Sequence, residues 1–204
     1  MSIDSYVYKI RHGAPGAPIL FAFHGTGGDE NQFFDFASRL MPGATIVSPR
    51  GDVTEGGALR FFRRRAEGVY DMEDLQVRQA ALARFVGAHA KETQAGMVLG
   101  LGYSNGANIL AAMMIGDGTL FDGGMLMHPL IPWVPEANGD LAGRDILITA
   151  GRNDPICPPA KTQALADYFE EQGASVGLEW HGGGHDIRPG EIEALQRFAG
   201  AIIG

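Results

Sequence analysis

Six short apolar segments recur along the chain, and their alternation with helical patterns constrains the fold more than any other feature. The apolar segments occupy residues 19–23, 45–48, 97–101, 124–127, 146–150 and 176–180. Runs of this length, bounded by turn residues, are typical of buried strands. Helical patterns lie between them at about 30–41, 73–92, 105–116, 159–173 and 189–203. The sequence therefore predicts an α/β fold, with a mainly parallel sheet and helices on both faces.

The length of the chain and of its connections narrows this architecture further. Alternating apolar and polar residues at 6–10 predict one more strand at an edge, which makes about seven in all. A chain of 204 residues without a Pro/Ser-rich linker is expected to form a single domain over residues 1–204. Only 16 residues separate Met127 from Arg144, which is too few for a separate cap domain.

A serine motif follows the third apolar segment. Residues 102–106 read Gly-Tyr-Ser-Asn-Gly, which matches the G-x-S-x-G nucleophile elbow. Small flanking residues permit the sharp turn that exposes the serine oxygen between a strand and a helix, and both elements are predicted here. Ser104 is therefore the candidate nucleophile.

A serine hydroxyl needs a base, which is itself oriented by a carboxylate, and both residue types follow later strands. Asp154 comes after the segment at 146–150, and two histidines, His181 and His185, follow the segment at 176–180. His185 is the preferred base because it lies on the loop, whereas His181 is still at the strand end. Their H-x-x-x-H spacing could suggest zinc, but the three intervening glycines oppose a helix, so no metal is expected. The remaining histidines are expected to be structural or exposed: His12, His24, His89 and His128.

Ester cleavage also needs two N–H donors for the oxyanion that forms at the carbonyl oxygen. The residue after the nucleophile, Asn105, supplies one backbone N–H. The glycine-rich segment at 24–28, which leaves the first buried strand, supplies the other, and Thr26 is the preferred donor.

Taken in order, these motifs resemble a known family. HGTGGDEN, PRGD, GYSNGAN, AGRNDPICP and GGGHD look like the carboxylesterase/phospholipase family of the α/β-hydrolases, which contains acyl-protein thioesterases, and above all a bacterial subgroup with an RFFRR segment. The resemblance implies carboxylic ester hydrolysis by Ser104, Asp154 and His185, without metal or cofactor. The eukaryotic thioesterases carry G-F-S-Q-G and a leucine where this chain has Tyr103, Asn105 and Thr26, which argues against lipidated-protein substrates.

Residues 49–72 form the longest segment without clear periodicity, and connections of that length are often functional. We expect this loop to cover the site, with Phe61 and Phe62 lining an acyl pocket beside Tyr103, and its arginines at the rim or paired with acidic residues. A pocket covered by one loop favours short acyl esters. The alternative is a loop that packs its own aromatic side chains and exposes its arginines.

Composition excludes several other classes. A net charge of -8 without a basic stripe argues against nucleic acid. No apolar run is long enough for a signal peptide or a membrane span, and Cys157 is the single cysteine, so a cytoplasmic protein is expected. The expected partner is a small ester substrate, and a homodimer stays open.

Other functions remain as alternatives to an esterase. A thioesterase, lipase or lysophospholipase would use the same triad. A dinucleotide-binding domain is disfavoured because the glycines at 100, 102 and 106 have the wrong spacing and no acidic residue ends the next strand. A non-catalytic binding protein on this fold would be expected to lack part of the machinery, and none is missing.

Overall fold

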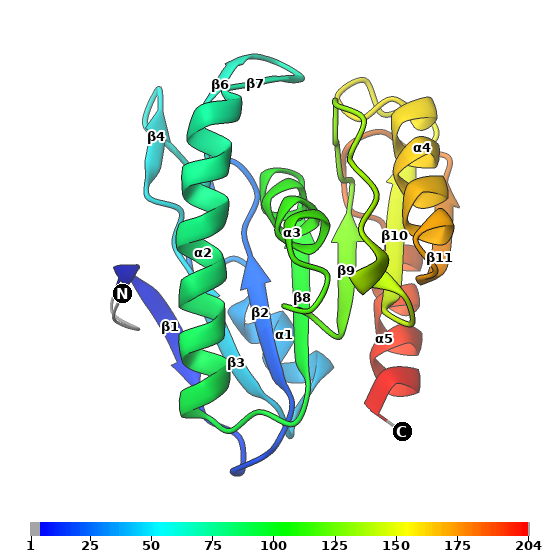
Figure 1. Cartoon of the computed structure of the whole chain (residues 1–204). Coiled ribbons are helices and arrows are strands. Elements are labelled where there is room, and N and C mark those ends of the chain that lie inside the picture. Colours follow the sequence, from blue (N-terminus) through cyan, green and yellow to red (C-terminus); the bar gives the residue numbers. More distant parts are fainter. Residues whose placement is uncertain (1–4, 204) are drawn as a thin grey trace.

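A seven-stranded sheet forms the centre of the molecule, whose computed structural model describes residues 5–203 (Figure 1). The strand order is β1-β3-β2-β8-β9-β10-β11, and every neighbouring pair is parallel except β1 with β3. The strands are β1 (Tyr8–Arg11), β2 (Ile19–Phe23), β3 (Thr45–Pro49), β8 (Val98–Tyr103), β9 (Gly123–Met127), β10 (Asp145–Gly151) and β11 (Ser175–His181). The predicted, mainly parallel sheet is confirmed.

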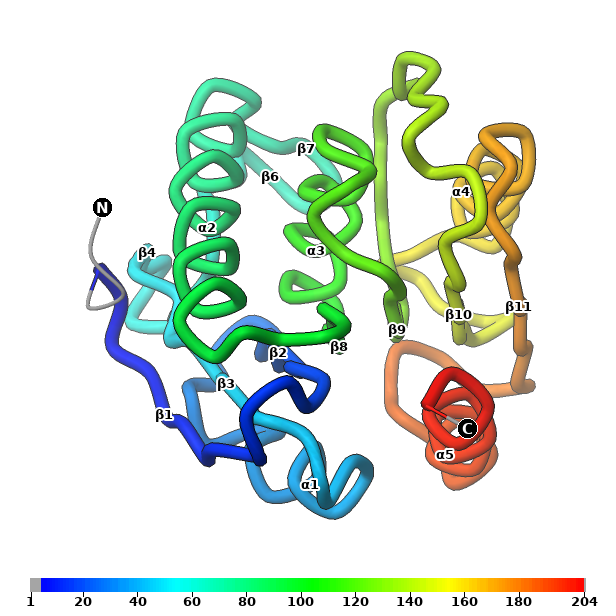
Figure 2. The backbone as a smooth tube through the Cα atoms, turned by 60° about the horizontal axis from the view of Figure 1, so that its bottom comes forward, coloured from blue at the N-terminus to red at the C-terminus, as the bar shows by residue number. Residues whose placement is uncertain are grey.

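Helices cover both faces of this sheet, as Figure 2 shows. One face carries α2 (Met72–Glu92), α3 (Asn105–Gly116) and α4 (Pro159–Glu171), and the other carries α1 (Phe34–Leu40) and α5 (Pro189–Ile203). Each layer has its own apolar core. Leu82, Ile109 and Phe169 belong to the core of the first layer, whereas Ala37 and Leu195 belong to that of the second. Burial of this apolar surface is the main contribution that favours the folded state.

The connections differ in how well the sequence predicted them. Residues 128–144 contain a 3-10 helix at Gly139–Leu141 and no cap domain, as expected. The segment at 49–72 was predicted to be irregular, and this is wrong. It forms two small hairpins, β4 (Val53–Glu55) with β5 (Ala58–Arg60), and β6 (Arg64–Ala66) with β7 (Val69–Tyr70). Their strands are only two or three residues long, too short to produce a recognisable alternation.

Parallel strands bring several chain segments to one edge of the sheet. The loops that follow β2, β8, β10 and β11 all leave from the carboxyl ends of these strands, where ligand sites of open α/β sheets lie. The motifs predicted from the sequence occupy these loops. Among residues 5–203, no helix combines the length and the apolar character needed to cross a membrane.

Candidate active site

Ser104 occupies a sharp turn between β8 and α3. Its backbone has φ 52° and ψ -117°, a left-handed conformation that is rare for residues other than glycine. Close packing explains the glycines beside it: a side chain at Gly102 would lie 2.6 Å from the carbonyl oxygen of Gly106, and one at Gly106 would overlap the carbonyl of Phe23. The turn therefore has the strained geometry of a nucleophile elbow.

Asp154 and His185 meet Ser104 from two other loops. The Nε2 atom of His185 lies 2.8 Å from the Oγ atom of Ser104, and its Nδ1 atom lies 2.7 Å from Oδ2 of Asp154. Asp154 is buried, whereas Ser104 and His185 are partly accessible. The three predicted residues are thus brought together in the order nucleophile, base and carboxylate, although they are far apart in the sequence.

Backbone donors hold the Asp154 carboxylate in the charged form. Burial raises its pKa, but the N–H groups of Cys157 and Ile156 and the rings of His128 and His185 outweigh burial, so the pKa lies below the usual value. The two N–H groups donate to Oδ1 at 3.0 and 2.8 Å, which leaves Oδ2 for the two histidines. Asp154 can therefore orient an imidazole as an ionised acceptor.

Tyr103 supports the histidine loop rather than the reacting atoms. Its hydroxyl donates to the backbone oxygen of His185 at 2.6 Å, and its ring lies against Gly25, where a side chain would approach to 2.7 Å. Burial raises the pKa of Tyr103 to about 12, with a smaller contribution from Asp154, so the phenol remains a donor at neutral pH. It also lines the cavity beside Ser104.

The two residues predicted for the oxyanion hole lie on the same cavity as Ser104. Thr26 follows β2, and its Oγ1 accepts a hydrogen bond from Arg60 at 2.7 Å. Asn105 begins α3 with a buried side chain, whose Oδ1 accepts from the backbone N–H of Phe61 at 2.7 Å. These contacts fasten segment 50–71, which joins β3 to α2, to the loop after β2 and to the elbow.

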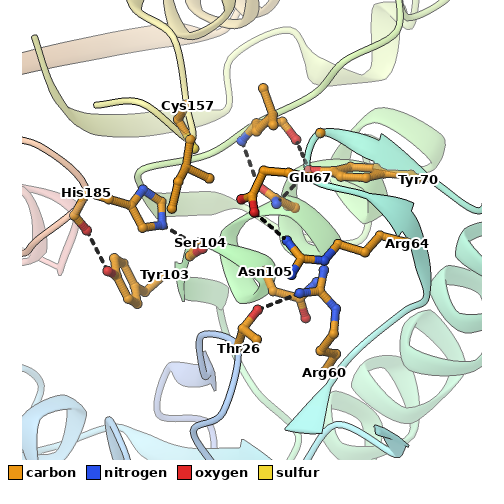
Figure 3. A pocket seen from close by; sticks show the side chains of 14 residues that line it. Thr26, Arg60, Arg64, Glu67, Tyr70, Tyr103, Ser104, Asn105, Cys157 and His185 are labelled. Carbon is orange, nitrogen blue, oxygen red and sulfur yellow. Dashed lines mark hydrogen bonds and ion pairs between the residues drawn. The ribbon is translucent and has the colours of Figure 1, made fainter. Parts of the chain in front are cut away.

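The cavity beside Ser104 measures about 250 Å³, and its wall is more polar than expected. In Figure 3, His185 and Tyr103 lie on one side of Ser104, while Arg60 and Arg64 lie across the cavity from His185. Both arginines form ion pairs: Arg60 contacts Glu55 at 3.3 Å, and Arg64 contacts Glu55 at 3.0 Å and Glu67 at 3.3 Å. Further lining residues come from several elements: Gly68, Tyr70, Asn108, Leu130, Ile156 and Cys157.

Phe61 and Phe62 do not line this cavity, contrary to the sequence-based expectation. They are 1% and 0% exposed and belong to the core cluster, where Phe61 packs on Phe23 and Phe62 on Tyr70. The arginines on either side of them, Arg60 and Arg64, face the cavity instead. The sequence could not indicate whether the phenylalanines or the arginines face the cavity, because both residue types occur in the walls of pockets.

His24 and His128 show how differently two isolated histidines can be used. His24 is structural, as expected: its Nδ1 lies 2.7 Å from the carbonyl of Gly25, and its Nε2 accepts from Gly51. His128, expected to be structural or exposed, is buried beside the triad. Its ring is buried, with Nδ1 2.9 Å from Oδ2 of Asp154, the oxygen that also faces His185. It follows β9, and only the pairing of β9 with β10 brings it beside Asp154.

A second acidic residue, Glu191, extends this group. It begins α5 and lies 3.1 Å from Nε2 of His128 and 3.2 Å from Nε2 of His181. Two histidines and one carboxylate at this spacing could also hold a metal ion. However, Nδ1 of His181 accepts from the backbone N–H of Gly183 at 3.0 Å, which leaves Nε2 to carry the ring proton. A protonated Nε2 cannot bind a metal ion, so the geometry favours charge contacts between the histidines and Glu191 over a metal centre.

Comparisons with known proteins agree with the fold and with a hydrolase of the esterase type. The chain is 37% identical over 188 residues to "Putative hydrolase MhqD" of Bacillus subtilis (strain 168), covering 91% of this chain and 94% of that protein. The crystal structure of protein Atu2452 of Agrobacterium tumefaciens superposes with a TM-score of 0.95 at 54% identity, covering 98% of each chain. The Bacillus cereus carboxylesterase superposes with a TM-score of 0.90 at 36% identity, covering 97% of this chain and 94% of that one.

No protein-family model matches the chain. The relative in Bacillus subtilis spans nearly the full length of both proteins, and the similar solved structures include a carboxylesterase. The chain therefore belongs to the family of MhqD, a family of esterase-type hydrolases with the α/β-hydrolase fold.

Proposed function

We propose that the protein is a serine carboxylesterase that cleaves short-acyl esters through an acyl-enzyme on Ser104. One observation carries the proposal: His185 lies within hydrogen-bond distance of both Ser104 and Asp154, at 2.8 and 2.7 Å. Nucleophile, base and carboxylate thus meet the geometric requirement for covalent catalysis without rearrangement.

In the proposed mechanism, the Ser104 hydroxyl donates its proton to Nε2 of His185 while its oxygen attacks the ester carbonyl. Asp154 accepts the hydrogen bond from Nδ1–H, which fixes the tautomer and stabilises the imidazolium. The imidazolium then protonates the leaving alcohol, and the acyl group remains on Ser104. Water, deprotonated by the same histidine, attacks the acyl-enzyme and releases the acid.

Backbone N–H groups of Thr26 and Asn105 are proposed to stabilise the tetrahedral oxyanion. Both residues border the cavity that exposes Ser104. The side chain of Thr26 is held by Arg60 and that of Asn105 by Phe61, so the segments that carry the two N–H groups are fastened before substrate arrives. Preorganisation of this kind is the usual source of oxyanion stabilisation.

The preference for short acyl groups rests on the size and lining of the cavity. Its volume of about 250 Å³ is below the roughly 300–1,000 Å³ of typical ligand pockets. The wall opposite His185 contains Arg60, Arg64 and Glu67, whose charged groups an alkyl chain cannot satisfy. A palmitoyl chain would have to leave the cavity, whereas an acetyl or butyryl group would remain inside.

Labelling with a fluorophosphonate probe tests the chemistry. The wild-type protein should be labelled on Ser104 and should hydrolyse p-nitrophenyl butyrate, and Ser104→Ala should lose both properties while its thermal transition stays nearly unchanged. Labelling that persists in Ser104→Ala would contradict the assignment of the nucleophile. For the acyl group, kcat/KM should fall from butyrate to palmitate, and a steady rise would contradict the short-acyl preference.

A further inference from the structure

His128 lies buried behind the triad with an acidic residue at each ring nitrogen. Its Nδ1 atom forms a hydrogen bond with Oδ2 of Asp154 at 2.9 Å, and its Nε2 atom is 3.1 Å from Oε1 of Glu191, a close ion-pair distance without an aligned hydrogen bond. The side chains of His128 and Asp154 are 0% exposed and that of Glu191 is 3% exposed, so water does not separate the charges. This residue has no part in the chemistry of Ser104 described above.

The positions of the protons follow from the partners of the two carboxylates. A neutral imidazole has one N–H, so its second nitrogen would turn a lone pair towards an acidic oxygen. Glu191 already accepts hydrogen bonds from the Thr149 hydroxyl at 2.6 Å and from the backbone N–H of Arg188 at 2.7 Å, which favours its ionised form. Asp154 is likewise ionised, so the extra proton lies on the ring of His128.

The pKa directions agree with this geometry. Burial lowers the pKa of His128, but its contacts with Glu191 and Asp154 outweigh burial and raise the pKa above the usual value. For Glu191, burial raises the pKa, and His128, Thr149 and Arg188 together bring it below the usual value. The other titratable groups that face His128 are His185, His181 and Tyr103, with ring centroids at 5.1, 5.3 and 5.8 Å, and the nearby Cys157.

The backbone of His128 is held in an unusual conformation. Its φ of 51° lies in the left-handed region, which costs free energy for a residue other than glycine. Two contacts fix it there: its N–H donates to the carbonyl of Thr149 at 2.8 Å, and its carbonyl accepts from the Cys157 thiol at 3.2 Å. The surrounding structure thus determines both the ring and the backbone of this residue.

We propose that His128 is a positioning residue of the esterase: an imidazolium between Asp154 and Glu191 that holds the Asp154 carboxylate in place and adds a positive charge beside His185. The inference rests on the proposed function of the triad. His185 can accept the Ser104 proton only when it is neutral, and a positive ring 5.1 Å away opposes a second positive charge. Removing the charge of His128 should therefore change the acid side of the pH profile of kcat/KM.

His128→Asn separates charge from shape. Asparagine tolerates a left-handed backbone and retains an N–H donor for Asp154, but it carries no charge. The pH at which kcat/KM for p-nitrophenyl butyrate falls by half on the acid side should move up by about one unit, since Coulomb repulsion at this separation is of that order. Asparagine cannot bridge Asp154 and Glu191 as the ring does, so Asp154 should be held less firmly and kcat should fall on the order of tenfold, with KM changed little.

The double variant His128→Asn/Glu191→Gln guards against a buried carboxylate without its cation, which could prevent folding. In this double variant, the pH at which kcat/KM falls by half on the acid side should also move up, because the positive charge nearer to His185 is gone. His89→Gln is the control. His89 is a buried histidine on α2 that packs on Phe85, so its replacement should lower Tm without moving the acid side.

Nitrogen NMR of the wild-type protein with labelled histidine tests the charge without any variant. Two protonated ring nitrogens are expected for His128 at pH 7, and signals missing from His128→Asn identify them. A single protonated nitrogen would overturn the inference, as would an unchanged acid side in both variants. These failures differ from failure of the proposed function, which would show as an unlabelled Ser104 and no ester hydrolysis in the wild-type protein.

Discussion

The elbow at residues 102–106 and the segment at 50–71 border the same cavity, but they acquire their structure in different ways. The elbow is a local motif whose glycines make room for one strained serine. Segment 50–71 depends on partners elsewhere: Arg60 donates to Thr26, and the N–H of Phe61 donates to Asn105. A local sequence motif therefore identifies the reacting residue, whereas contacts with distant segments decide which side chains surround it.

The largest expected effect is the loss of kcat when a residue of a local motif is replaced. Two histidines of one loop provide the comparison. His185→Ala should lower kcat on the order of 10⁴-fold or more, as triad knockouts do. His181→Ala should cost less than about tenfold, because its Nε2 contacts Glu191 and not the triad. Steady-state kinetics with p-nitrophenyl butyrate measures both. A reversed order would show that His181 is the base.

Replacing Phe61 tests whether segment 50–71 serves the core or the pocket. Phe61→Ala should destabilise the protein by about 3–5 kcal/mol, the usual cost of truncating a buried phenylalanine, because its ring packs on Phe23 and His24. Urea denaturation measures the change. The dependence of kcat/KM on the acyl chain length of the ester, measured on the folded protein, should stay as in the wild type. A stable variant with an altered profile would return Phe61 to the pocket wall.

A pair of glycine substitutions separates the strained elbow from an ordinary helix. Gly106→Ala should destabilise by about 1–3 kcal/mol or more, since its new methyl group would overlap the Phe23 carbonyl. Gly87→Ala in α2 meets nothing within 4 Å and should stabilise the protein by about 0.5–1 kcal/mol. Thermal denaturation compares the two. Equal changes in stability would mean that Gly106 is less tightly packed than its contact with the Phe23 carbonyl implies.

The smallest effect concerns an ion pair that joins the loop after β2 to the start of segment 50–71. Arg50 contacts Glu30 at 2.5 Å, and this hydrogen bond, opposed by burial, lowers the pKa of Glu30. A lowered carboxylate pKa stabilises the folded state above the unfolded value of about 4.3, and the stabilisation is lost as pH falls through the folded value.

Wild-type protein should therefore be slightly more stable than Glu30→Gln at pH 7, and the difference should disappear in acid. Urea midpoints between pH 7 and pH 3 measure the difference. Glu92→Gln at the exposed end of α2 is the control and should give a smaller difference at pH 7. A difference for Glu30→Gln that grows on acidification would contradict the assignment.

The sequence by itself determined the order of the helices and of the strands in the central sheet, and the identity of the three residues that meet at the sheet edge. Periodicity and glycine-rich turns are local features, so they can be recognised in a single sequence. For example, β2 begins and ends at the predicted residues. Ser104, Asp154 and His185 could be selected because each follows a predicted strand, and parallel strands end at a common edge.

Tertiary structure alone decided what surrounds those residues. Whether arginine or phenylalanine of segment 50–71 faces the cavity depends on hairpins of two or three residues per strand, held by contacts to distant loops. His128 belongs to no recognisable sequence motif. Glu191 lies in the first turn of α5, on the face of the sheet that α1 also covers. Only the pairing of β9 with β10 and the return of α5 bring both to Asp154, because long-range packing, not local propensity, sets these distances.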